Sequence, residues 1–117
     1  MIIKKNADVP VHKMQGDQIK NVYKKVLIGP DDGSEKIIMR KFKLYSGGKT
    51  PHHIHEHEHV VKIEKGKGLV VDGNGKEINI SIGQSLFIPG GEKHQFKNPY
   101  KESFEFLCII LNPDKKE

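Results

Sequence analysis

Hydrophobic and polar residues alternate over short stretches of this chain, and residues typical of turns separate the stretches. β-Branched and aromatic residues are frequent in them, and each stretch has the length of a strand and not of a helix. The turns are rich in glycine, proline, asparagine and aspartate. The predicted strands are residues 19–28, 36–45, 58–65, 68–72, 76–82, 85–88, 93–97 and 103–111. Many short strands at this spacing predict an all-β fold, an antiparallel sandwich or barrel.

The alternation also predicts which side chains point inward, because neighbouring residues of a strand face opposite sides of the sheet. In 76–82, Ile78, Ile80 and Ile82 share one face and are expected to be buried. In 36–45, Arg40 shares its face with apolar residues, so this cation is aimed at the interior. A buried arginine needs a carboxylate of the protein or an anionic ligand as its partner.

Residues 103–111 are apolar on both faces. Phe104, Phe106 and Cys108 share one face, and Leu107, Ile109 and Leu111 occupy the other. Because one face already points inward, the 107/109/111 face needs a cover of its own. We therefore expect a homodimer.

The length of 117 residues predicts a single domain spanning 1–117. The net charge is +5, but 19 of the 20 basic residues are lysines scattered along the chain, so no nucleic-acid partner is expected. A single cysteine, Cys108, excludes an internal disulfide and suits a reducing compartment. No apolar run is long enough for a membrane span, and the first residues lack a signal peptide. A cytoplasmic location without membrane contact is the resulting expectation.

Five of the seven histidines fall within eight residues. They are His52, His53, His55, His57 and His59. In an extended strand the last four project to one face, where neighbouring imidazoles can reach a common metal ion at about 2.0–2.2 Å. A histidine-rich surface loop or an exposed edge strand is the alternative interpretation.

A second pattern follows at residues 83–98, where Gly83, Pro89, Gly91, His94 and Asn98 have the spacing of the second cupin motif. The first cupin motif is matched over 47–66 by Gly47, His53, His55 and Gly66. The chain thus resembles the cupin superfamily over nearly its whole length. This resemblance implies a jelly-roll antiparallel β-barrel with the two motif strands adjacent and a metal site inside.

The chain departs from the first cupin motif at one position, where His59 stands in place of a glutamate. Glu58 is adjacent, but it breaks both the motif spacing and the strand parity. With the resemblance, these features predict a four-histidine metal site formed by His53, His55, His59 and His94. His57 has the same strand parity as these ligands but is not a position of the first cupin motif. It is expected behind the ligands or in the pocket wall. Because only neutral imidazole binds metal, we expect occupancy to fall as the pH drops through about 6.

The resemblance favours manganese or iron, with nickel or zinc as alternatives. No nucleophile and base set is recognisable, so the catalytic residues are unknown and any chemistry is expected at the metal. The resulting prediction is a dioxygenase-type oxidoreductase for a small organic molecule, with Arg40 as a candidate substrate anchor. Two alternatives stay open, a non-catalytic binding or sensory protein and a sugar or organic-acid isomerase or decarboxylase.

Overall fold

Strands make up almost all of the regular structure in this computed structural model, which describes residues 1–114. The strands are β1 (His12–Lys13), β2 (Lys20–Ile28), β3 (Ile37–Lys49), β4 (His59–Lys65), β5 (Lys67–Val71), β6 (Glu77–Ser81), β7 (Ser85–Ile88), β8 (Gln95–Lys97) and β9 (Phe104–Leu111). There are also two single turns of 3₁₀ helix among these residues. Asn6–Asp8 precedes β1, and Pro30–Asp32 lies between β2 and β3. The predicted all-β fold is confirmed.

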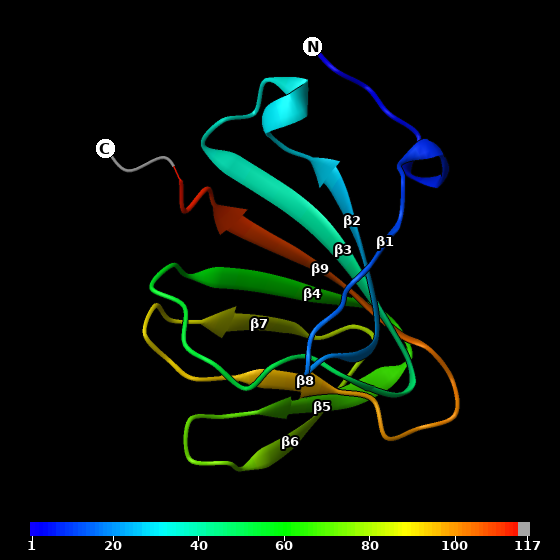
Figure 1. Ribbon diagram of the computed structural model, residues 1–117, viewed down its shortest axis with the longest axis vertical. Coiled ribbons are helices and arrows are strands. Elements are labelled where there is room, and N and C mark those ends of the chain that lie inside the picture. Colours follow the sequence, from blue (N-terminus) through cyan, green and yellow to red (C-terminus); the bar gives the residue numbers. More distant parts are fainter. Residues whose placement is uncertain (115–117) are drawn as a thin grey trace.

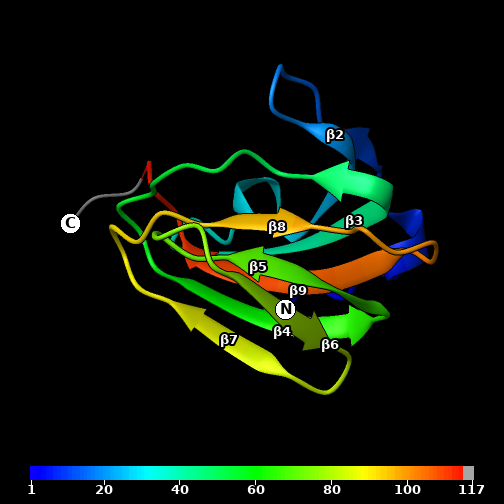
Figure 2. The ribbon, with the colours of Figure 1, turned by 90° about the horizontal axis from the view of Figure 1, so that it is seen from below.

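The strands form one antiparallel sheet that curls into a half-barrel (Figures 1 and 2). Along the sheet the order is β6-β5-β8-β3-β9-β4-β7, and β2 pairs with β3 outside this path. The long strand β3 runs alongside β9 and meets β8 only near its end, at Lys49 and Lys97. β4 begins at His59 of the first motif, and β8 directly follows His94 of the second motif. The curl of the sheet brings these two strands to the same concave side.

The sequence predicted seven of the strands to within about two residues, placed the end of β3 four residues too early and missed β1. The strand predicted over 36–45 was expected to end before the glycines at 47 and 48, but β3 continues to Lys49 through an irregular register against β2. Asn98 stabilises this part of β3, because its backbone N–H and C=O pair with Gly48 and Gly47. Hydrogen bonds across the sheet thus extend β3 beyond the end that the local sequence predicted.

The core fills the concave side of the sheet. Its fully buried side chains are Val22, Leu44, Val61, Ile63, Phe104 and Phe106. In β6 only Ile80 is buried, whereas Ile78 and Ile82 are exposed, so the expectation for these two residues was wrong. The physical reason is that β6 ends the path of paired strands and only part of one face has a layer to pack on.

Asn98, the last residue of the second motif, has a structural role. It is 1% exposed, and its Nδ2 donates to the carbonyl oxygens of Leu44 and Glu102 at 2.9 and 2.8 Å. Its Oδ1 accepts from the Tyr100 N–H at 3.0 Å. One buried amide thereby joins β3 to the segment between β8 and β9.

The convex side of the sheet carries an uncovered apolar row. Phe87, Val60 and Ile109 are direct neighbours across β7, β4 and β9, and with Leu111 they are 40 to 62% exposed. Leu107 is half-buried in the same strand. Separately, none of the helices formed by residues 1–114 has the length and apolar character of a membrane span.

Candidate metal centre

The histidine-rich segment lies between β3 and β4 and is held against the second motif by backbone hydrogen bonds. Thr50 pairs with Phe96 through its backbone N–H and through its Oγ1. His53 and His94 form an isolated antiparallel bridge. The Gly91 N–H donates to the His55 carbonyl at 2.7 Å. These contacts bring two segments about forty residues apart in the chain into register.

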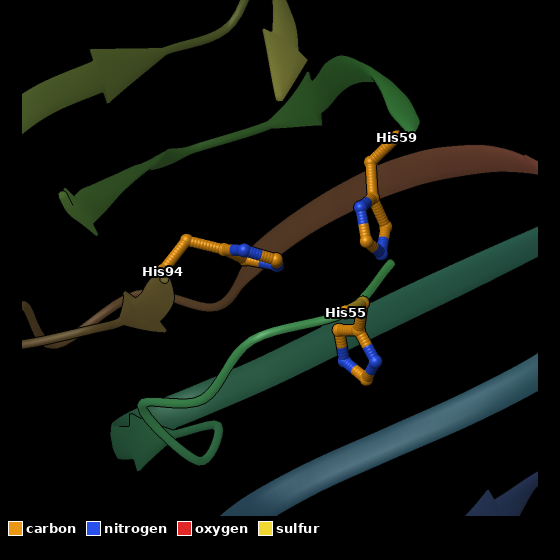
Figure 3. A group of neighbouring side chains, drawn as sticks. All are labelled: His55, His59 and His94. Atoms are coloured by element: carbon orange, nitrogen blue, oxygen red, sulfur yellow. The ribbon is translucent and has the colours of Figure 1, made fainter. Parts of the chain in front are cut away.

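Three of the four predicted ligands lie close together, namely His55, His59 and His94. Each offers a ring nitrogen, and these nitrogens lie within 4.8 Å of one another (Figure 3). The His59 and His94 ring centroids are 4.8 Å apart, and both residues are buried. His59 begins β4, His94 precedes β8 and His55 comes from the connecting segment, so three parts of the fold converge here.

His53 and His57 lie beside this group. The Nε2 atoms of His53 and His55 are 2.7 Å apart, close to the separation of about 3 Å that neighbouring ligands of one ion adopt. His53 is nevertheless outside the three whose nitrogens all lie within 4.8 Å. The His57 ring is 4.7 Å from that of His59 and 4.9 Å from that of His55. Among the described residues, His57 is not one that lines the adjoining cavity.

The hydrogen bonds of two rings leave nitrogens available for an ion. His94 Nδ1 lies 2.9 Å from the Glu92 carbonyl oxygen, to which it donates as N–H, so Nε2 carries the lone pair. His59 Nδ1 is buried without a hydrogen-bond partner in the part of the chain that is described. A buried polar atom of this kind is costly unless something satisfies it. The donor set therefore fits a divalent transition metal.

Burial keeps these imidazoles neutral in the metal-free chain. Desolvation is the largest cause, and it lowers the pKa of His55 to about 4 and that of His59 to about 3. The pKa values of His57 and His94 are lowered chiefly by the same effect, and neighbouring histidines contribute. Neutral imidazole is the form that binds metal.

A cavity of about 210 Å³ adjoins the histidines. His53, His55, His59 and His94 line it on one side. Its apolar wall includes Met14, Val22, Phe42, Phe96 and Phe106. Phe104 shares a strand face with Phe106, but it is fully buried in the core and does not line the cavity.

Arg40 also lines the cavity, as its strand parity predicted. Its Nη2 donates to Cys108 Sγ at 3.1 Å, across the β3–β9 pair. Its guanidinium lies 5.0 Å from the centre of the Phe42 ring. Arg40 Nε is buried without a hydrogen-bond partner among residues 1–114.

The structure corrects the expected local geometry of the cluster. Residues 54–58 are not in a strand, and β4 begins at His59, so strand parity does not explain where His55 and His57 point. Glu58 is exposed and His59 is 5% exposed, which agrees with the assignment of position 59 to the interior. The bridge to His94 and the Gly91 hydrogen bond hold the segment in place of regular pairing.

The sequence missed three residues near the cavity. Met14 and Ile19, which precede and follow a bend beside the unpredicted β1, line it without any recognisable pattern. Lys24 pairs with Phe42 and faces the same side of the sheet, so Arg40 is not the only cation with interior parity. Burial and the nearby Arg40 charge lower the pKa of Lys24. The sequence contained a signal for the inward orientation of Lys24, because Val22 and Val26 have the same strand parity and are apolar.

Comparison with known families gives one match over most of the chain. Residues 40–110 match the family described as Cupin domain. This range contains the histidine-rich segment, His94, Arg40 and Cys108.

Two curated proteins are similar in sequence. A 1-methylthio-D-xylulose 5-phosphate methylsulfurylase of Rhodospirillum rubrum is 29% identical over 105 residues, which cover 89% of this chain and 65% of that protein. An oxalate-binding protein of Thermotoga maritima is 33% identical over 75 residues, covering 63% of this chain and 61% of that protein. The chain thus spans less than two thirds of the length of either relative.

A solved structure with a similar fold is that of the polyketide cyclase RemF from Streptomyces resistomycificus. It has a TM-score of 0.90 and 26% sequence identity, and the match covers 96% of this chain and 80% of that one.

Proposed function

This chain belongs to the cupin superfamily, and on that premise we propose that it is a manganese- or iron-dependent oxidoreductase of the dioxygenase type. Its substrate in this proposal is a small organic molecule bound in the cavity beside the histidines. The metal ligands are His53, His55, His59 and His94. The observation that carries the proposal is the convergence of His55, His59 and His94 to within 4.8 Å at the wall of a cavity.

Support for a fourth ligand comes from the position of His53. Its Nε2 is 2.7 Å from that of His55, and its backbone is bridged to His94. His53 also lines the cavity beside His55, His59 and His94. Four histidines hold an ion without adding negative charge.

A bound first-row ion supplies a Lewis acid with open coordination positions and, as manganese or iron, a redox centre. The chain's own residues have other tasks. The aromatic wall excludes water from one side of the cavity, and the Glu92 carbonyl fixes the orientation of the His94 ring. Nickel and zinc suit the same imidazole donors, and zinc or nickel would support binding or Lewis-acid chemistry without redox change.

Two other functions remain as candidates. Similarity to an oxalate-binding protein favours a binding or sensory role without turnover. A sugar or organic-acid isomerase or decarboxylase of the same fold is the other candidate. The relative named for a sugar phosphate supports a sugar derivative as its substrate. In each of these alternatives the histidines and the cavity still form the binding site. The alternatives differ only in whether the bound molecule is converted and by which reaction.

The first experiment is elemental analysis of untagged protein, followed by reconstitution of metal-free protein with Mn²⁺, Fe²⁺, Ni²⁺ or Zn²⁺. We expect one ion per chain and a loss of binding in His59→Ala. Dioxygen uptake with the manganese or iron form, in the presence of small organic acids and alcohols, supports the oxidoreductase. Ligand binding without uptake supports the binding protein, and conversion without dioxygen supports the isomerase or decarboxylase.

A further inference from the structure

We propose that Arg40 is the binding residue for the carboxylate of a small organic acid, held in the cavity with its other end against the histidines. This inference names the substrate class and rests on the proposed function, because it places the acid beside the proposed metal ligands. It stands on the position of Arg40, its unused donors and the charge of the cavity.

Arg40 has hydrogen-bond capacity that the protein does not use. A guanidinium group carries five N–H donors. Within residues 1–114 the only partner of these donors is Cys108 Sγ, a weak acceptor, at 3.1 Å. The Nε–H is buried and without a partner. A buried donor on a charged group is destabilising when it is left without an acceptor, so a ligand that accepts from it gains affinity.

Within residues 1–114, no carboxylate neutralises this cation. No described Asp or Glu lines the cavity or forms an ion pair with Arg40. Burial raises the pKa of the Cys108 thiol, so its sulfur carries no compensating charge. Lys24 adds a second cation on the same face of the sheet. The positive charge of Arg40 therefore favours a negatively charged ligand in the cavity.

The size and walls of the cavity limit that guest. A dry apolar cavity of about 150 Å³ holds a benzene molecule. The volume of about 210 Å³ therefore admits an acid of roughly the size of benzoate. Phe42, Phe96 and Phe106 provide an apolar surface for its body. A planar carboxylate suits the planar fork of arginine better than a single-point cation.

The test uses two probes of the same shape, benzoate and benzamide, titrated calorimetrically into the full chain, both metal-free and loaded with Mn²⁺. We expect benzoate to bind at least about tenfold more tightly than benzamide. Arg40→Met should remove this preference, and Arg40→Lys should retain part of it. Lys43→Met removes one positive charge from the same strand, where Lys43 lies over the Tyr45 ring, and serves as the matched control. It should bind both probes as the wild type does.

Cys108 gives an independent readout, because it is the chain's single cysteine and contacts Arg40. Benzoate should slow its alkylation by iodoacetamide in the wild type and in Lys43→Met, and should leave the rate unchanged in Arg40→Met. Phenyl phosphate, titrated alongside, tests the other common oxyanion. Tighter binding of phenyl phosphate than of benzoate would overturn the carboxylate assignment.

The two proposals fail separately. Arg40→Met should keep the wild-type metal content and circular dichroism, because Arg40 is not among the proposed ligands. Preserved benzoate affinity in a folded Arg40→Met variant would sink the Arg40 proposal and leave the metal site standing. Absence of metal binding by the wild-type chain would sink the metal site. A benzoate preference that the wild-type chain retains and Arg40→Met removes would then leave the Arg40 proposal standing.

Discussion

At the scale of single residues, one position distinguishes this site from the motif that it otherwise matches. Position 59 carries histidine where the first cupin motif has glutamate, and the residue is buried next to His94. Glu58 is exposed. The site therefore gathers neutral nitrogen donors, and a carboxylate is absent from the cavity lining within residues 1–114.

The first prediction compares these two neighbours. His59→Ala should weaken metal binding by more than about 100-fold, since loss of even an outer hydrogen-bond partner costs about 10–100-fold. Glu58→Ala should leave the affinity nearly unchanged. His59→Glu should bind metal and lower its reduction potential, because a carboxylate adds negative charge. Metal content and affinity at matched pH check the three variants, and metal loss in Glu58→Ala with retention in His59→Ala contradicts the assignment.

The second prediction concerns pH and the metal-free chain. The histidines of an unfolded chain take up protons near pH 6.5, whereas burial lowers the pKa of His55 to about 4 and that of His59 to about 3. The unfolded state then binds more protons than the folded state, so stability is full above about pH 6.5 and decreases as the pH falls toward 4. The melting temperature should fall over this range, and less steeply in His59→Phe. An equal slope in both proteins would contradict the assignment of this effect to His59.

The same shifts change the expected pH dependence of metal binding. The sequence alone suggested loss of metal near pH 6. Because desolvation lowers the pKa values of His55, His59 and His94, protons compete with the metal at these three residues only at lower pH.

At the scale of elements, the site depends on contact between two irregular segments. The connection between β3 and β4 carries His55, and the turn between β7 and β8 lies against it. Gly91 in that turn has φ +85°, a conformation that favours glycine, and donates its N–H to the His55 carbonyl. A Cβ added at Gly90 would clash with the Glu56 carbonyl oxygen. The turn is thus a support for the histidine-rich segment.

The third prediction tests that support. Gly90→Ala should displace the backbone around Glu56 and lower metal affinity by about tenfold or more, because ligand geometry is sensitive to small shifts. Its circular dichroism should be unchanged. Gly73→Ala is the control, since the nearest atom to its added Cβ is the Lys93 carbonyl oxygen at 3.7 Å. Equal metal affinities in the two variants would show that the turn does not position the ligands.

The fourth prediction concerns Asn98, which matches the second motif without touching the site. Asn98→Ala leaves the Leu44 and Glu102 carbonyls without their donor, so it should cost about 2–4 kcal/mol of stability and lower the melting temperature by about 10 °C or more. Metal affinity measured well below the melting temperature should change little. A large loss of affinity in a folded Asn98→Ala variant would assign this residue to the site instead.

At the scale of the whole molecule, the curled sheet separates two surfaces. The concave side holds the core and the cavity, whereas the convex side exposes the row formed by Phe87, Val60 and Ile109. Contiguous exposed apolar groups of this kind are uncommon on a monomer surface. We propose that a second copy of this chain covers the row, in keeping with the homodimer expected from Leu107, Ile109 and Leu111.

The fifth prediction tests this assembly. Light scattering at micromolar concentration should give twice the chain mass of 13.3 kDa for the wild type. Val60→Lys places a charge at the centre of the row and should give a monomer. Ile82→Lys, at an exposed position after the edge strand β6, should leave the dimer intact. A monomeric wild type would rule the dimer out.

The sequence by itself located most of the strands and indicated the histidines of the candidate site. Period-two alternation and turn residues are local signals, so they located eight strands, seven of them to within about two residues. The spacing of His53, His55, His59 and His94 indicated a family and a ligand set. The inward position of Arg40 followed from the same alternation. Local patterns carried these inferences because each depends on residues that are close together in the chain.

Only the tertiary structure decided how the histidines meet. Their segment is not a strand, and its course follows from hydrogen bonds to His94 and Gly91, about forty residues away. The exposure of Ile78, the course of β3 past Ser46 and the cavity contacts of Met14 likewise depend on which distant strand lies alongside. Alternation fixes the side to which a residue points, whereas pairing between distant segments fixes what lies on that side. For this reason only the folded chain shows that Arg40 Nε is buried without a hydrogen-bond partner among residues 1–114.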